Sequence, residues 1–338
     1  MRRFEHYVMV MMDGEMANDL FLDMTRQDDV SIYYTKRNES SPIRQFIKKV
    51  HCSFKTNKFI ELPGKDLWER SILNNVKPNS CYMFLSTSLV TISSRLLKKL
   101  RNNPNHPKLV LLLIDSLSAN SYHLRYPSVR RTISNFKWDE VVSFDEADCK
   151  KYGYKYMGQH LYTKLSPQDV GLSDNHTVDY DLQYAGADKR GRNAIVYQIF
   201  KYLTDKNVKC KFTMMDNIAN DYKYKIQPGL KIIHRGIPYR QILRDVMSTN
   251  VILEVMQGGQ IQQTARYYEA VCYNKKLLTN NDYVKKLQFY NPEYMKIFHS
   301  LEDIDIDWLR DDSMKIDYHY DNEFSPVKIL DIIDENVK

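Results

Sequence analysis

The chain has 338 residues, of which 43% are hydrophobic, so it is long and apolar enough for about two domains with buried cores. Its five cysteines are scattered singly, which disfavours a disulfide scaffold or a cysteine metal site and is typical of reduced thiols in the cytoplasm. The longest apolar run, Leu109–Ile114, is far too short to span a bilayer. No long apolar run follows the basic start, so we expect no signal peptide.

The net charge of +7 lies in the first half of the chain. Residues 1–170 carry 26 Lys and Arg against 18 Asp and Glu, whereas residues 171–338 carry 23 against 24. A solvated basic surface explains this excess, and an anionic membrane or a nucleic acid would explain it too.

In the first half, apolar runs alternate with amphipathic segments. Strands are predicted at Tyr7–Met12, Ser31–Thr35, Cys81–Ser86, Leu109–Ile114 and Val141–Phe144. Helices are predicted at Ala17–Met24, Pro42–Val50, Gly64–Leu73, Thr91–Arg101 and Asp145–Lys151. This alternation is typical of a parallel α/β domain, expected over residues 1–165.

The second half repeats the alternation after a segment with little periodicity, residues 166–179, which we interpret as a linker. Strands are predicted at Tyr180–Ala185, Lys209–Met214, Leu230–Ile233, Val251–Val255 and Lys276–Thr279. Helices are predicted at Asn193–Leu203, Pro238–Met247, Thr264–Asn274 and Pro326–Val337. The fold class is therefore α/β, with two doubly wound, Rossmann-like domains facing a cleft, the second over residues 180–325.

The stretch Val251–Asn281 has the pattern of an anion site. A strand carrying Glu254 leads into a turn of amides and glycines, Gln257–Gln260, and then into a helix that opens near Thr264. Backbone N–H groups and the helix dipole meet at such a point. Arg266 lies in the first turn, where the dipole disfavours a cation, and it is therefore a candidate for gripping an anion.

A second basic loop, Gly186–Arg192, also follows a strand and opens a helix. Lys189, Arg190 and Arg192 could contact phosphate oxygens, and a solvated helix start is the alternative at about even odds. The two loops together favour a diphosphate ligand. Glu269 suits a pair of sugar hydroxyls, or else simply stabilises the dipole of its helix.

In the first domain, Asp13, Glu15 and Asp115 follow strands, and a carboxylate there could be the general base toward an acceptor hydroxyl. Helix capping is the more common role for Asp13 and Asp115, and a structural role is the more common one for His123. No metal-ligand cluster, GxGxxG or GxxxxGK[ST] motif occurs, which disfavours a metal site, a nicotinamide enzyme or a P-loop ATPase.

The helix Thr91–Arg101 has an apolar and a cationic face, so it could lie on a membrane. An ordinary helix covering the sheet has the same pattern, and the neighbouring strands favour that alternative.

Three blocks of sequence resemble bacterial GT-B-type glycosyltransferases of lipopolysaccharide, capsule and exopolysaccharide biosynthesis. They are Ser143–Met157, Asp181–Arg192 and Ile237–Asn281. The last is similar to the family pattern E-x-x-Q-x-G-Q-x-G-x-T-x-R-x-x-E-A, which is matched by Glu254, Gln257, Gln260, Thr264, Arg266, Glu269 and Ala270. Gln262 stands where the family usually has a glycine, and Ile261 where GT-B enzymes have the first of two glutamates eight residues apart.

The resemblance implies GT-B architecture, a UDP- or GDP-linked sugar donor in the second domain and a glycan or lipid-linked glycan acceptor in the first. By the same resemblance, the enzyme needs neither a metal nor a cofactor. Arg192 and Arg266 would bind the diphosphate of the donor, and Glu269 would bind its ribose. The candidate donor-binding residues are Gly186, Lys189, Arg190, Arg192, Glu254, Gln257, Gln260, Thr264, Arg266 and Glu269. The last helix, residues 326–338, would pack back on the first domain.

We therefore expect a cytoplasmic glycosyltransferase at the inner face of the cell membrane. A non-catalytic GT-B partner of an active glycosyltransferase is the main alternative, motivated by Gln262 and by the lack of a clear base. A nucleic-acid binder ranks last, because the basic residues are dispersed and form no recognition motif.

Overall fold

A computed structural model describes residues 2–35, 39–58, 60–117, 124, 126–188, 191–216, 224–234, 236–256 and 263–338. The chain divides into two compact units, one of Met1–Thr163 with Glu323–Lys338 and the other of Lys164–Asn322. None of the helices in the described ranges is long and apolar enough to cross a membrane.

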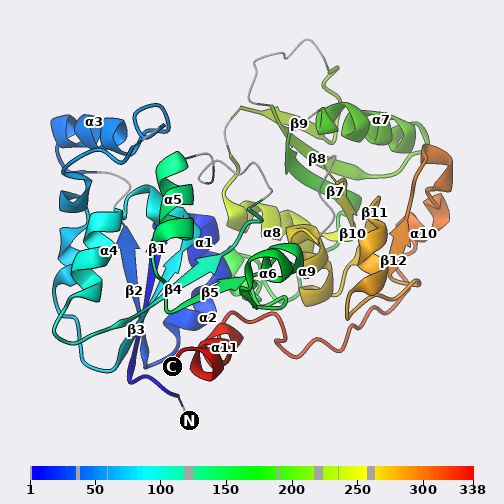
Figure 1. The fold of residues 1–338 in the computed structure, drawn as a ribbon. Helices are drawn as coiled ribbons and strands as arrows, with labels where there is room; N and C mark the ends of the chain where they lie inside the picture. The colour runs from blue at the N-terminus through cyan, green and yellow to red at the C-terminus, as the bar shows by residue number, and fades with distance from the viewer. Residues whose placement is uncertain are drawn as a thin grey trace. The chain divides into compact units, whose positions relative to one another are not determined.

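The first unit contains a six-stranded parallel sheet in the order β2-β1-β3-β4-β5-β6 (Figure 1). Its strands are β1 His6–Met12, β2 Val30–Thr35, β3 Ser80–Leu85, β4 Lys108–Leu113, β5 Glu140–Ser143 and β6 Lys155–Tyr156. Its helices are α1 Glu15–Leu20, α2 Leu22–Thr25, α3 Pro42–His51, α4 Ser94–Arg101, α5 Pro127–Asn135, α6 Glu146–Tyr152 and α11 Lys328–Asn336. All six residues of β3 are buried, as expected for a parallel strand covered on both faces.

The second unit contains another six-stranded parallel sheet, in the order β12-β11-β10-β7-β8-β9. Its strands are β7 Tyr180–Ala187, β8 Cys210–Met215, β9 Leu230–Ile233, β10 Thr249–Glu254, β11 Lys276–Thr279 and β12 Met295–Ile297. Its helices are α7 Arg192–Asp205, α8 Tyr239–Met247, α9 Ala265–Cys272 and α10 Ile306–Arg310. Two sheets of parallel strands covered by helices confirm the prediction of two doubly wound, Rossmann-like halves.

Several element predictions were wrong or incomplete. The helix predicted over Gly64–Leu73 is two short 3₁₀ segments, η1 Lys65–Leu67 and η2 Arg70–Leu73. Tertiary ion pairs hold this stretch, because Asp66 pairs with Lys99 at 2.6 Å and Glu69 with Lys48 at 2.9 Å. Sequence periodicity also missed α5, β6 and β12, of which the two strands have only two and three residues.

Helix α4 covers the sheet of the first unit. The residues of its apolar face, Leu96, Leu97 and Leu100, are each 1% exposed within the core, and Ser93 caps its N-terminus by accepting the N–H of Leu96 at 3.0 Å. This face cannot enter a bilayer. The hypothesis of a membrane contact through Thr91–Arg101 is therefore wrong for the apolar face, and the covering-helix alternative is confirmed.

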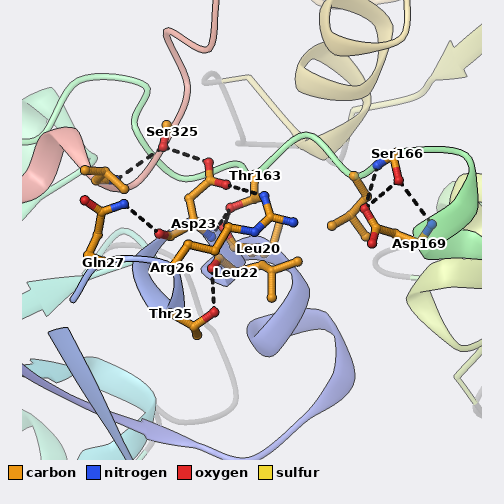
Figure 2. A network of polar contacts seen from close by, with 12 residues as sticks. Leu20, Leu22, Asp23, Thr25, Arg26, Gln27, Thr163, Ser166, Asp169 and Ser325 are labelled. Atoms are coloured by element: carbon orange, nitrogen blue, oxygen red, sulfur yellow. Dashed lines mark hydrogen bonds and ion pairs between the residues drawn. The ribbon is translucent and has the colours of Figure 1, made fainter.

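Both chain connections to the second unit are fastened to α2 (Figure 2). The backbone N–H of Asp23 donates to Thr163 Oγ1 at 3.1 Å, and Ser325 Oγ donates to Asp23 Oδ2 at 2.8 Å. Asp23 is thus hydrogen-bonded to the segment that leaves the first unit and to the segment that returns. Helix α11 follows the return and buries Ile329, Leu330 and Ile333 in the core of the first unit.

Candidate functional site

The candidate site lies at the carboxyl edge of the second sheet, between β7 and β10. The strand order is β9-β8-β7-β10-β11-β12. Strands β8 and β9 are added on one side of β7, and β10, β11 and β12 are then added on its other side. Loops that follow two such strands diverge and leave a crevice, which is where open α/β sheets bind ligands. Both sequence stretches predicted to bind a diphosphate follow these two strands.

Arg192, the first residue of α7, joins the ends of the two strands. Its Nη2 donates to the carbonyl of Ala187, the last residue of β7, and its Nη1 donates to the carbonyl of Val255 at 3.3 Å, just after β10. Its buried Nε has no hydrogen-bond partner within the described ranges. Backbone oxygens thus hold the guanidinium at the crevice, and its Nε–H has no acceptor among the described residues.

Gly186 provides the space that this arrangement needs. A Cβ at this position would clash with the hydroxyl of Tyr184 and lie 3.3 Å from Arg192 Nη2. Burial raises the pKa of Tyr184, and the positive charges of Arg192 and Arg266 oppose that rise. Both arginines therefore lie near one buried phenol, whose hydroxyl lacks a hydrogen-bond partner in the described part of the chain.

Glu254, at the end of β10, fastens the start of α9. It is 2% exposed, and its Oε1 accepts the Oγ1–H of Thr264 at 2.5 Å and the N–H of Thr264 at 3.3 Å. Its Oε2 accepts the hydroxyl of Thr279 in β11 at 2.6 Å. Thr264 in turn caps α9 by accepting the N–H of Arg266 at 3.1 Å, so Glu254 and Thr264 position the helix rather than face the crevice.

Arg266 and Glu269 form a buried pair on α9. Arg266 Nη1 lies 2.8 Å from Glu269 Oε2, and Glu269 is 0% exposed. Although this distance defines an ion pair, neither atom completes a hydrogen bond of good geometry among the described residues. The other carboxylate oxygen of Glu269 accepts the hydroxyl of Tyr239 at 3.3 Å. Arg266 is thus only partly satisfied by its own chain.

The buried carboxyl of Glu269 predicts a pH dependence of stability. Burial raises its pKa from 4.5 to about 7, against the opposing effect of Arg266. Because the folded-state pKa is the higher one, the stability contribution of the protonated carboxyl is full below about pH 4.5 and is lost as the pH rises through 7. Between these limits the free energy of unfolding of the wild type should fall by up to about 3 kcal/mol relative to Glu269→Gln. Urea denaturation of both proteins across this range measures the difference, and parallel pH profiles would contradict it.

The structure brings six of the predicted donor-binding residues to this edge of the sheet. They are Gly186, Arg192, Glu254, Thr264, Arg266 and Glu269. Lys189, Arg190, Gln257 and Gln260 lie outside the described residues, as do Gln262 and His123. The direct role of each in donor binding stays a prediction.

Sequence reasoning missed Tyr184 and Tyr239. The sequence analysis singled out neither residue, since Tyr184 lies within a predicted strand and Tyr239 at the start of a predicted helix. A tyrosine two residues before a glycine, near the carboxyl end of a strand, could have indicated Tyr184, because a buried phenol keeps a polar hydroxyl.

The two candidate bases lie at the carboxyl edge of the first sheet. Asp13 directly follows β1, is exposed, and accepts a hydrogen bond from Asn18 Nδ2 at 3.1 Å. Asp115 lies two residues after β4 and is half-buried. The N-cap of α1 is Gly14, so Asp13 does not cap that helix. One strand, β3, separates β1 from β4, which places the two strand ends about 10 Å apart.

A separate cavity of about 440 Å³ lies in the second unit. Its lining includes Met247 and Lys275, which precede β10 and β11, so it opens at the amino edge of that sheet. It is therefore distinct from the crevice at the carboxyl edge, where the two arginines lie.

Comparison with solved structures identifies the fold. The chain is similar to an alpha-glucosyltransferase in complex with UDP and a 13-mer DNA containing a central A:G mismatch, with a TM-score of 0.57, 12% identity, and 97% of this chain and 95% of the other covered. It is similar to the alpha,alpha-trehalose 6-phosphate synthase of Burkholderia multivorans, with a TM-score of 0.52, 7% identity and coverage of 98% and 93%. It is also similar to the glycotransferase of kitacinnamycin, with a TM-score of 0.51, 8% identity and coverage of 99% and 100%.

These neighbours are GT-B glycosyltransferases, and the chain has their fold of two Rossmann-like halves. Identities this low show the fold alone. No protein-family model matches the sequence, and no curated protein matches it either.

Proposed function

We propose that the chain is a glycosyltransferase that moves a sugar from a UDP- or GDP-linked donor to a glycan acceptor. The observation that carries the proposal is that Arg192 contacts the ends of β7 and β10, where the strand order reverses, and that Arg266 lies in the first turn of α9, which follows β10. Arg192 Nε and Arg266 Nη1 complete no hydrogen bond among the described residues. These N–H groups could donate to the acceptor oxygens of a diphosphate, of which there are four or more.

In the proposed mechanism the arginines stabilise the negative charge that develops on the leaving nucleoside diphosphate. No metal or other cofactor is assigned a part. A carboxylate of the first unit, Asp13 or Asp115, accepts the proton of the acceptor hydroxyl if the reaction inverts the sugar configuration. We further propose that the acceptor is a lipid-linked glycan of surface polysaccharide synthesis, and that the protein acts at the cytoplasmic face of the membrane.

One observation favours the non-catalytic alternative. Glu269, the residue expected to hold the ribose, is fully buried and already contacts Tyr239 and Arg266. To bind Glu269, the ribose of a sugar donor would have to displace this carboxylate from its contacts with Arg266 and Tyr239. A GT-B-fold partner of an active glycosyltransferase would need no such rearrangement.

A thermal-shift screen against UDP, GDP, dTDP and CMP tests donor binding. A ligand that binds only the folded state raises stability with occupancy, by about 2.7 kcal/mol at 100 times Kd. We expect UDP or GDP to raise the melting temperature and CMP, which has a single phosphate, to raise it least. No shift with any of the four would end the proposal.

Release of nucleoside diphosphate from a panel of nucleotide sugars then separates enzyme from partner, because a non-catalytic protein releases none. The assay should be run with and without EDTA, and with glycan and duplex DNA as competing acceptors. Duplex DNA is included because one structural neighbour, an alpha-glucosyltransferase, is bound to DNA. Transfer to DNA alone would replace the glycan acceptor.

A further inference from the structure

Helix α3 turns its apolar side chains outward. Ile43, Phe46, Ile47 and Val50 are 73%, 68%, 43% and 37% exposed. Their spacing of i, i+3, i+4 and i+7 places them in one stripe along the helix, which in a globular domain normally faces the core. Figure 1 shows α3 at the margin of the first unit. The stripe is therefore a continuous apolar surface and not a set of scattered side chains.

Polar contacts fix the opposite face of α3 to the protein. Lys48 is 3% exposed, and its Nζ lies 2.9 Å from Glu69 Oε1 and 3.2 Å from Glu39 Oε1. Trp68 Nε1 donates to His51 Nδ1 at 3.0 Å. These contacts hold the helix with its apolar stripe outward, because rotating the stripe inward would break a buried ion pair.

Cations lie beside the stripe. Residues 41–60 contain five Lys and Arg and no Asp or Glu, and of these five Arg44 and Lys48 pair with Glu39 and Glu69. Lys49 lies on the exposed part of the helix, and Lys55 lies in the exposed segment after it. A helix with apolar and cationic side chains exposed together matches a bilayer with anionic headgroups.

Two other occupants fit less well. A nucleic acid would be recognised by the cations and would leave Ile43 and Phe46 exposed, since its backbone offers no apolar surface to them. A second copy of this chain, packed symmetrically on the stripe, would bring the exposed Lys49 and Lys55 of both copies toward one another.

We propose that α3 docks this protein on an anionic lipid bilayer. Ile43, Phe46, Ile47 and Val50 enter the interface between headgroups and acyl chains, while Lys49 and Lys55 contact the headgroups. α3 is the first helix after the carboxyl end of β2, in the sheet whose carboxyl edge carries Asp13. Only the use of this docking to reach a lipid-linked acceptor rests on the proposed function.

Sedimentation of the full chain with vesicles, in the absence of any sugar donor, tests the docking. We expect binding to phosphatidylcholine vesicles that contain phosphatidylglycerol, weaker binding to phosphatidylcholine alone, and weakening by salt. The double variant Ile43→Ser/Phe46→Ser should lower the partition coefficient at least about tenfold. Lys49→Glu/Lys55→Glu should lower it by about tenfold or more.

Matched controls lie in the second unit. Ile195 and Ile226 are 46% and 67% exposed there, so Ile195→Ser/Ile226→Ser removes a comparable pair of exposed apolar side chains. Lys201→Glu/Lys209→Glu changes the same charge at two exposed lysines. Both controls should bind vesicles as the wild type does, and circular dichroism should show that all four variants are folded.

Three results would overturn the docking proposal. The first is binding to neither vesicle, or binding that the α3 variants leave unchanged. The second is binding of duplex DNA that is lost in Lys49→Glu/Lys55→Glu and kept in Ile43→Ser/Phe46→Ser, without vesicle binding. The third is a dimer in sedimentation equilibrium that Phe46→Ser dissociates. Because no donor or acceptor is present, failure of the transferase assay would leave the vesicle result unaffected.

Discussion

Arg266→Ala is expected to weaken UDP binding by roughly 1.5–3 kcal/mol, about tenfold to a hundredfold in Kd, because one charge-assisted contact to the diphosphate is lost. The same change should lower the free energy of unfolding by about 2 kcal/mol or more at pH 8. The physical reason for the second effect is that Glu269, which is 0% exposed and 2.8 Å from Arg266 Nη1, loses its cationic partner.

The double variant Arg266→Ala/Glu269→Gln separates the two effects. Glutamine at position 269 carries no charge, so stability should recover to within about 1 kcal/mol of the wild type, whereas UDP binding should not recover. Isothermal titration with UDP and urea denaturation of the wild type, both single variants and the double variant complete the cycle. Comparing the double variant with Glu269→Gln isolates the effect of Arg266. Equal UDP affinity in these two proteins would remove Arg266 from the donor site.

Glu254→Ala is expected to lower the free energy of unfolding by about 3 kcal/mol. It leaves three donors without their buried acceptor, namely the N–H and hydroxyl of Thr264 and the hydroxyl of Thr279. The start of α9 then loses its connection to β10 and β11. Urea denaturation measures the loss, and hydrogen exchange should show faster opening of α9 than of β11.

Glu254→Gln is the matched control, since it keeps the shape of the side chain and one acceptor oxygen. Burial raises the pKa of Glu254, so the fold tolerates a neutral group there. We expect this variant to lose about 1 kcal/mol and to bind UDP as the wild type does. Loss of UDP binding with unchanged stability would instead show that Glu254 contacts the donor.

Much of the second sheet could be predicted from the sequence. β9 and β11 have the predicted bounds, and β10 differs from its prediction by at most two residues at either end. Strand β11 is fully buried and centres on the apolar pair Leu277 and Leu278. Strand β9 lies at the sheet edge, where the exposed Lys231 stands between apolar residues. Thr264 was also identifiable as a helix start, because a threonine before a helix caps it with its own hydroxyl.

Local patterns could not distinguish inward from outward faces. The α4 and α3 segments both have apolar residues at helical spacing beside lysines and arginines, yet α4 buries its apolar face and α3 exposes it. The two helices differ in the ion pairs that their lysines make with residues distant in the sequence. Lys48 of α3 lies 2.9 Å from the buried Glu69, while Lys99 of α4 reaches Asp66 with its apolar face packed underneath. These partners are 21 and 33 residues away, beyond the range of any periodicity.

The sequence by itself determined that this protein has two parallel α/β halves, because the alternation of apolar runs with amphipathic segments is a local feature. It also indicated which loops carry the cations. Only the tertiary structure decided the order β9-β8-β7-β10-β11-β12, and with it the hydrogen bond from Arg192 to the carbonyl of Val255. The physical reason is that strand order is set by packing between segments some 60 to 80 residues apart. The site exists because that order reverses beside β7.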